Sequence, residues 1–126
     1  MVQSRWGNKE ELEKERQELI KSLPRWKDIL RGSVLTYFIP CGKQGCRCKR
    51  DKDSLHGPYY YISVKEEGKT RMYLLGRKRK EAVYAVARYN DMMKKIYRIC
   101  KINLRLLLIR KEEDEKREKE EEISGR

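Results

Sequence analysis

The chain has 126 residues, which is enough for one domain with extensions but not for two sizeable domains. Lys and Arg number 32 against 20 Asp and Glu, so the net charge is +12, and apolar residues make up only 38%. No run approaches the roughly 18–20 consecutive apolar residues that a membrane span needs, and the charged start of the chain does not resemble a secretory signal. We therefore expect a cytoplasmic protein with a small core and an anionic partner, most often nucleic acid.

The positive charge is concentrated in the middle of the chain. Residues 1–23 carry five basic and five acidic side chains, residues 24–109 carry 21 and seven, and residues 110–126 carry six and eight. We expect any anion to be bound by the middle segment. The predicted organisation is an N-terminal helical segment (1–31), a zinc-binding three-stranded sheet (32–76), and a long amphipathic helix with a charged tail (77–122).

The first segment has helical spacing. Asn8 followed by Glu11 has the form of a capping box. Apolar residues then recur at helical intervals: Leu12, Leu19, Ile20 and Leu23.

Pro24 interrupts this helix. We predict that it lies in the first turn of a short second helix capped by Ser22, where its missing N–H costs nothing, and that Gly32 ends this helix. One face of it would be apolar: Trp26, Ile29 and Leu30.

Three runs rich in β-branched and aromatic residues predict strands at 34–39, 59–64 and 70–75. The last two are joined by a short hairpin connection at 65–69, in which Gly68 is free to adopt a positive φ. The sequence therefore predicts an α+β fold: a small three-stranded antiparallel sheet with a zinc-stapled loop, flanked by an N-terminal helix and a long C-terminal helix.

The long helix is predicted from about Arg79 to Glu122. Residues spaced by three and four form a heptad seam: Val86, Tyr89, Met93, Ile96, Cys100, Asn103 and Leu107. We expect Cys100 to be a small core residue of this seam. A second apolar set lies beside it: Ile99, Ile102, Leu106 and Ile109. Either the N-terminal helix or a second copy of the chain could cover the seam.

Three cysteines and the only histidine follow the first predicted strand in the pattern C-x4-C-x-C-x7-H: Cys41, Cys46, Cys48 and His56. Three thiolates and one imidazole are a standard closed ligand set for Zn²⁺. Two alternatives stay open. Two of the thiols could form a disulfide, or His56 could be only a polar residue that begins the turn at Gly57-Pro58. A closed site offers no position for an activated water, so we do not expect an enzyme or a small-molecule substrate.

A series of short motifs surrounds this site: Gly32-Ser33, Cys41-Gly42-Lys43, Cys46-x-Cys48, His56-Gly57-Pro58-Tyr59-Tyr60-Tyr61, Gly68-Lys69-Thr70 and Tyr73. Over about residues 30–76 the chain resembles a small prokaryotic domain family of unknown function that carries the same series. The resemblance implies a common fold and a cysteine–histidine site, and it implies almost nothing about activity.

Basic residues in three places are candidates for phosphate contacts. They lie in the cysteine loop (Lys43, Arg47, Lys49 and Arg50), before the long helix (Lys69, Arg71, Arg77, Lys78, Arg79 and Lys80), and along one helix face (Lys94, Arg98, Lys101 and Arg105). The second set could instead be a solubilising turn, and the third an ordinary solvated helix face.

The middle strand suggests a further contact. Tyr60, Ile62 and Val64 share one face, so Tyr59 and Tyr61 would stand on the other and could stack on bases. Alternatively, helices could cover both faces and bury all the tyrosines.

Two functions fit these features. The first is a non-enzymatic, zinc-containing nucleic-acid-binding protein, with RNA slightly favoured over DNA, which is compatible with a ribonucleoprotein or with mobile DNA. The alternative is an assembly module in which the long helix forms a homodimer or larger assembly and zinc is structural.

Overall fold

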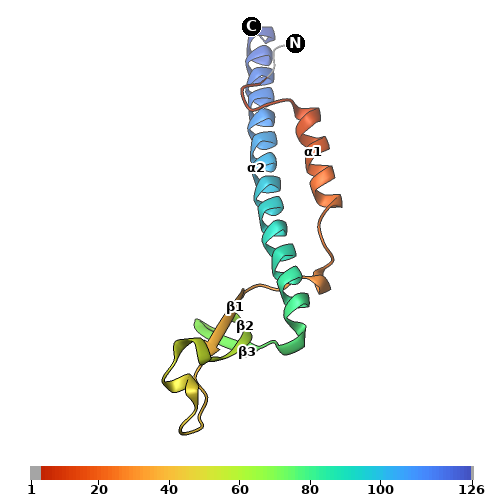
Figure 1. The fold of residues 1–126 in the computed structure, drawn as a ribbon. Helices are drawn as coiled ribbons and strands as arrows, with labels where there is room; N and C mark the ends of the chain where they lie inside the picture. The colour runs from red at the N-terminus through yellow and green to blue at the C-terminus, as the bar shows by residue number, and fades with distance from the viewer. Residues whose placement is uncertain (1–3, 126) are drawn as a thin grey trace. The chain divides into compact units, whose positions relative to one another are not determined.

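The computed structural model describes residues 4–125, and Figure 1 shows the order of their elements. Helix α1 (Lys9–Lys21) is followed by strands β1 (Ser33–Ile39), β2 (His56–Glu66) and β3 (Lys69–Leu74), and then by the long helix α2 (Arg79–Ser124). The predicted α+β fold is confirmed: the chain has a three-stranded antiparallel sheet, an N-terminal helix and a long C-terminal helix.

Contacts divide the chain into two compact units. Unit 1 is Met1–Leu23 with Met92–Arg126, so it contains α1 and most of α2, whereas unit 2 is Pro24–Asp91 and contains the sheet. No helix within residues 4–125 combines the length and apolar character needed to cross a bilayer.

Helix α1 begins where the sequence predicts. The side chain of Asn8 accepts a hydrogen bond from the backbone N–H of Glu11 at 3.1 Å, which satisfies one of the free donors of the first turn. The helix ends at Lys21, and the N–H of Ser22 donates back to the carbonyl of Leu19 at 3.1 Å.

The prediction of a short second helix after Pro24 was wrong. Trp26–Asp28 forms a single 3-10 turn, and Ser22 is the C-cap of α1 rather than the N-cap of a new helix. A short helix needs an apolar face held by tertiary packing, but the Trp26 side chain is 76% exposed. The segment is instead fixed within unit 2 by its backbone, because the N–H of Leu30 donates to the carbonyl of Ala85 at 3.2 Å.

The sheet has the order β1-β2-β3, and both pairings are antiparallel. Glu67 and Gly68 form a two-residue connection between β2 and β3, with φ of 51° and 80°. Two consecutive positive φ values are typical of the hairpin turns that match the twist of the strands. The turn thus sets the register of β2 with β3, in which Tyr61 lies opposite Leu74. The separate pairing of β1 with β2 places Tyr61 opposite Leu35.

The core of unit 1 lies between α1 and α2. Leu12 of α1 packs with Ile102, Leu106 and Ile109 of α2, and Ile102 is fully buried. Trp6 packs against the same cluster from the segment before α1.

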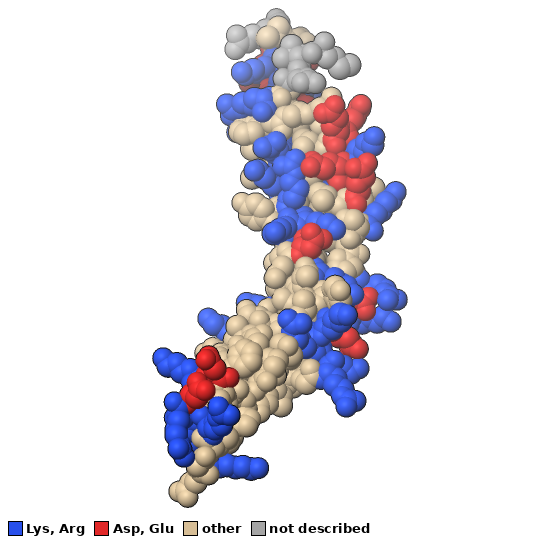
Figure 2. Space-filling model, in the orientation of Figure 1, with Lys and Arg blue, Asp and Glu red and all other residues tan. Residues whose placement is uncertain are grey.

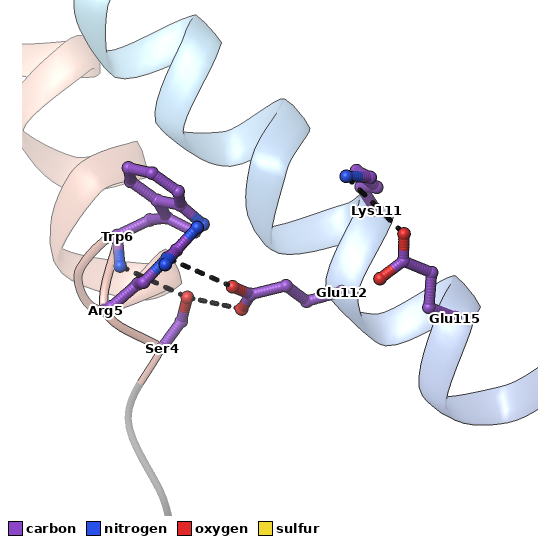
Figure 3. Close-up of polar contacts among 6 residues, drawn as sticks. All are labelled: Ser4, Arg5, Trp6, Lys111, Glu112 and Glu115. Atoms are coloured by element: carbon purple, nitrogen blue, oxygen red, sulfur yellow. Dashed lines mark hydrogen bonds and ion pairs between the residues drawn. The ribbon is translucent and has the colours of Figure 1, made fainter. Parts of the chain in front are cut away.

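The chain before α1 is held to α2 by polar contacts (Figure 3). The Ser4 hydroxyl donates to a carboxylate oxygen of Glu112 at 2.7 Å, and the Arg5 Nε lies 4.0 Å from the other oxygen. The Arg5 guanidinium also lies over the Trp6 ring, 4.4 Å from its centroid. These contacts keep Trp6 against the core of unit 1.

The predicted heptad seam is not the buried stripe of α2. Met93, Cys100, Asn103 and Leu107 are exposed, and the Asn103 side chain accepts a hydrogen bond from Arg16 at 2.8 Å. The expectation that Cys100 is a core residue was therefore wrong. The second apolar set supplies the core through Ile102, Leu106 and Ile109, because this is the side of α2 that α1 covers.

Candidate metal centre and the surface around it

The pairing of β1 with β2 brings the two ends of the cysteine loop together. Ile39 at the end of β1 lies opposite His56 at the start of β2, so Cys41 and His56 enter the loop from neighbouring strands. Cys46 and Cys48 lie at and within the 3-10 turn Arg47–Lys49, where Cys48 is buried.

Close packing of the backbone also explains the residue that follows His56. Gly57 has φ +141°, and an added Cβ would lie 2.7 Å from the carbonyl oxygen of Tyr37. A side chain at this position would therefore push β2 away from β1 beside the cluster.

The four predicted metal ligands converge. The candidate ligand atoms of Cys41, Cys46, Cys48 and His56 all lie within 4.8 Å of one another. The Cys46 Sγ is 3.3 Å from His56 Nε2, and the Cys48 Sγ is 3.5 Å from the Cys41 Sγ. In a tetrahedral site with zinc–sulfur bonds of about 2.3 Å, two sulfurs are about 3.8 Å apart. The distances between the ligand atoms therefore fit four ligands around one tetrahedrally coordinated metal ion. The thiols are all free, and no disulfide joins them in the described residues.

The environment of the cluster favours a thiolate at one cysteine. The backbone N–H of Cys48 and hydrogen bonds with His56, Cys48 and Cys41 lower the pKa of Cys46 from 9.0 to about 6. The pKa of Cys48 moves the other way: its thiolate gains the backbone N–H of Cys41, at 3.2 Å, but burial and the sulfurs of Cys46 and Cys41 outweigh that bond. A divalent ion would remove the conflict by holding all three thiolates at once.

Four basic side chains of the cysteine loop are exposed and lack an ion pair within residues 4–125: Lys43, Arg47, Lys49 and Arg50. Three thiolates around one divalent ion carry a net charge of −1, which these cations help to offset. They still leave positive charge for an external anion.

The basic residues before α2 are less uniform than the sequence suggests. Arg71 forms an ion pair with Glu66 at 3.4 Å and Lys78 forms one with Glu81 at 3.1 Å. The Arg79 guanidinium lies over the Tyr60 ring, 4.4 Å from its centroid. The remaining three form no ion pair within the described part of the chain: Lys69, Arg77 and Lys80.

A groove of about 590 Å³ opens beside this segment within unit 2. Leu30, Ala82 and Ala85 contribute apolar surface to it. Basic side chains from separate parts of the chain also line it: Lys27, Lys78, Lys80 and Arg88. The groove is not evident from the sequence, because its basic residues are far apart in the chain.

The basic face predicted along α2 belongs to unit 1, whereas the cysteine loop belongs to unit 2. Its Arg98 is bound to Glu15 of α1 by two hydrogen bonds of 3.0 and 2.8 Å. This bidentate bond and the charge of Arg98 lower the pKa of Glu15. The other three cations of this face form no ion pair within residues 4–125 and can contact an external anion: Lys94, Lys101 and Arg105.

The tyrosines of β2 divide between the two faces of the sheet as predicted. Ile62 is buried and Tyr60 half-buried on one face, whereas Tyr59 is exposed and Tyr61 half-buried on the other. None of the three is buried, so the alternative in which all are buried supports was wrong. Tyr37 lies opposite Tyr59 on the same face but was not among the candidate residues predicted from the sequence. Only the register of β1 reveals it, and no short turn fixes that register in the sequence.

The fold and the cluster define a small α+β protein with a potential Cys3His metal site in a loop between two antiparallel strands. The chain belongs to the family called Domain of unknown function (DUF6788), whose model matches residues 9–85. The match includes α1, the whole sheet and the first turns of α2, and is thus wider than the resemblance over 30–76. No significant match is found among curated proteins or among solved structures.

Proposed function

We propose that this protein is a non-enzymatic nucleic-acid-binding protein, with RNA favoured over DNA, in which Zn²⁺ held by the Cys3His cluster fixes a basic loop on the sheet. The observation that carries the proposal is the excess of cations without acidic partners in unit 2. That unit has 16 Lys and Arg against seven Asp and Glu. Figure 2 shows Lys and Arg side chains around the sheet, with few acidic residues among them on the visible face.

The positions of these cations suit an extended polyanion better than a single small anion. Lys43, Arg47, Lys49 and Arg50 lie on the cysteine loop between β1 and β2, here called the metal loop, and Lys80 lines the groove beside the start of α2. Flexible cations spread over such a surface neutralise successive phosphates, and each contact releases counterions. A lone phosphate would instead be enclosed by several donors.

The preference for RNA and the absence of catalysis are supported by different features. Exposed aromatic residues on a sheet suit the unpaired bases that RNA presents in loops and ends, and no helix–turn–helix pattern is evident in the sequence. Three thiolates and one imidazole complete a tetrahedral site, so no coordination position is left to activate a water.

The experiment exchanges Arg77, Lys78, Arg79 and Lys80 for Gln. We expect weaker binding to every RNA and DNA tested. We also expect the log–log salt dependence to become shallower by roughly 0.7–0.9 per lost phosphate contact. Fluorescence anisotropy at several salt concentrations measures both quantities.

The matched control removes the same charge from the acidic end of α2, by exchanging Lys111, Lys116, Arg117 and Lys119 for Gln. The control should keep the wild-type affinity and salt slope. Equal affinities for the two variants and the wild type would contradict the proposal.

A second candidate function, self-assembly, is favoured by an apolar stripe of α2 in unit 1 that α1 leaves uncovered. Its members are all exposed and are spaced by four, three, four and three residues: Met93, Tyr97, Cys100, Leu104 and Leu107. This spacing is that of a coiled-coil seam. We infer that the occupant is a second copy of this chain.

The charges beside the stripe select a parallel arrangement of the two copies. Lys94 and Lys101 flank the stripe on one side and Ile96 and Asn103 flank it on the other. In a parallel pair each lysine faces an uncharged residue of the opposite flank, whereas an antiparallel pair places lysine against lysine.

We expect light scattering to give twice the 15.2 kDa chain mass at micromolar concentration. Leu104→Glu should restore the monomer because it places a charge in the seam. Ile123→Glu is the matched control, since Ile123 is also an exposed apolar residue of α2 but lies outside the stripe. A monomeric wild-type protein would rule out this function.

A further inference from the structure

One face of the sheet, here called the open face, carries a continuous set of aromatic and aliphatic side chains. Directly opposite residues of antiparallel strands share a face, so the register identifies its members. Tyr37 pairs with Tyr59, Leu35 with Tyr61, Tyr61 with Leu74, and Ser63 with Met72. The six apolar members of the open face are Leu35, Tyr37, Tyr59, Tyr61, Met72 and Leu74.

The open face is accessible over all three strands. Tyr37 and Tyr59 are 38% and 36% exposed, and Met72 and Leu74 are 44% and 61% exposed. Tyr37 and Tyr61 lie edge to face, with ring centroids 5.7 Å apart and an angle of 73° between the rings. This contact holds the Tyr37 and Tyr61 rings in place before any ligand binds, which lowers the entropy cost of stacking a base on them.

The tyrosines of the two faces differ in their polar contacts. On the opposite face, the Tyr73 hydroxyl donates to the Glu66 carboxylate at 2.8 Å, and Tyr60 lies under Arg79. On the open face, the hydroxyls of Tyr37, Tyr59 and Tyr61 form no hydrogen bond with any described residue. The tyrosines of the opposite face are therefore engaged in contacts within the protein, whereas those of the open face keep their hydroxyls free for a ligand.

The charge next to the open face indicates its partner. Tyr37 and Tyr59 form the pair nearest the metal loop, because Ile39 and His56 at the base of that loop are the next pair in the ladder. The loop between them carries five basic and two acidic residues. A flat apolar face beside unpaired cations is complementary to a single strand, whose bases are exposed and whose phosphates follow them. A base-paired duplex offers the phosphates but no free base faces.

We propose that the open face stacks unpaired bases of a single-stranded nucleic acid, with Tyr37 and Tyr59 as the principal rings, while the metal loop binds the adjacent phosphates. This proposal rests on the nucleic-acid-binding function above and assigns it a substrate class, single strands. The Tyr37–Tyr59 pair lies across two strands, so successive bases of one strand can each meet a ring.

The experiment compares a single-stranded oligouridine of about 12 nucleotides with an RNA duplex of equal length. Replacing both Tyr37 and Tyr59 by Leu keeps apolar bulk but removes the rings. Single-strand affinity should fall about 5- to 150-fold for each lost stack. Duplex affinity and the salt slope should stay at the wild-type values. The double Phe variant keeps the rings and should retain single-strand binding within a few-fold.

Tyr73→Leu is the matched control, because it removes an exposed tyrosine from the opposite face of the same sheet. An equal loss in this control would overturn the proposal. So would unchanged single-strand affinity in the double Leu variant, and in that case the proposed function would stand. Failure of the wild-type protein to bind either probe would instead refute the proposed function itself.

A second measurement needs no substitution and guards against a variant that loses its fold. Oligouridine containing 5-iodouridine is irradiated with the wild-type protein, and the crosslinked peptides are mapped by mass spectrometry. We expect adducts on Tyr37, Tyr59 or Tyr61. Adducts found only outside the open face would overturn the proposal.

Discussion

We expect the Cys3His cluster to bind a metal ion, and removal of this ion to unfold the sheet of unit 2 while the α1–α2 pair of unit 1 stays helical. Unit 2 has few buried side chains in its described residues: Cys48, Ile62, Ala82 and Ala85. One of these is itself a candidate ligand, so we expect a metal ion to stabilise the sheet in place of a larger apolar core. Structural zinc sites contribute about 10–16 kcal/mol of apparent binding free energy near neutral pH. That is comparable with the whole stability of a small domain.

Elemental analysis should find one zinc ion per chain. After chelation, near-ultraviolet circular dichroism and amide exchange of the β1–β2 pair should change, and most of the helical signal should remain. Cys46→Ser should have the same effect. Cys100→Ser is its control, because Cys100 is exposed and lies outside the cluster. Protein purified without metal, with Cys41, Cys46 and Cys48 all reactive towards thiol reagents, would show that the cluster is not a metal site.

Ile102→Ala is expected to lower the free energy of unfolding of unit 1 by about 2–5 kcal/mol. Ile102 is the one side chain of the described residues that is fully buried, and it packs with Leu12, Leu106 and Ile109. The substitution leaves a cavity between two helices that are also joined by the Arg98–Glu15 pair, so the backbone has little freedom to close it.

Urea unfolding followed by circular dichroism at 222 nm measures this loss. Leu104→Ala is the control, because Leu104 lies on the same helix but is 55% exposed. At a concentration where the protein is monomeric, the control should change the free energy of unfolding by less than about 1 kcal/mol. Similar losses in both variants would mean that α1 does not cover the Ile102 side of α2.

The sheet and the metal cluster were predictable because their signals are local. Alternating apolar residues, the glycine of the Glu67-Gly68 turn, and four ligands within 16 positions require no knowledge of distant contacts. The buried side of α2 was not predictable in the same way. This helix is apolar on more than one side, so periodicity alone does not decide whether Cys100 or Ile102 faces α1.

Long-range polar pairs were missed for the same reason. Glu15 and Arg98 are 83 positions apart, and each looks like an ordinary surface charge on its own helix. The short helix predicted after Pro24 failed for a different reason. Its apolar residues have helical spacing, but the Trp26 side chain is largely exposed and does not pack against the rest of the protein. Without such packing, a few residues do not offset the unfavourable free energy of helix nucleation.

The Glu67-Gly68 turn also implies an order of assembly for the sheet. The β2–β3 hairpin closes over two residues and can form within microseconds in the isolated chain. Pairing of β1 with β2 must instead close the whole segment 40–55, and its entropy cost increases with the length of that loop. A metal ion held by Cys41 and His56 would close the same loop. The hairpin can therefore form early, and we expect a metal ion at the cluster to favour the later addition of β1 to the sheet by offsetting this entropy cost.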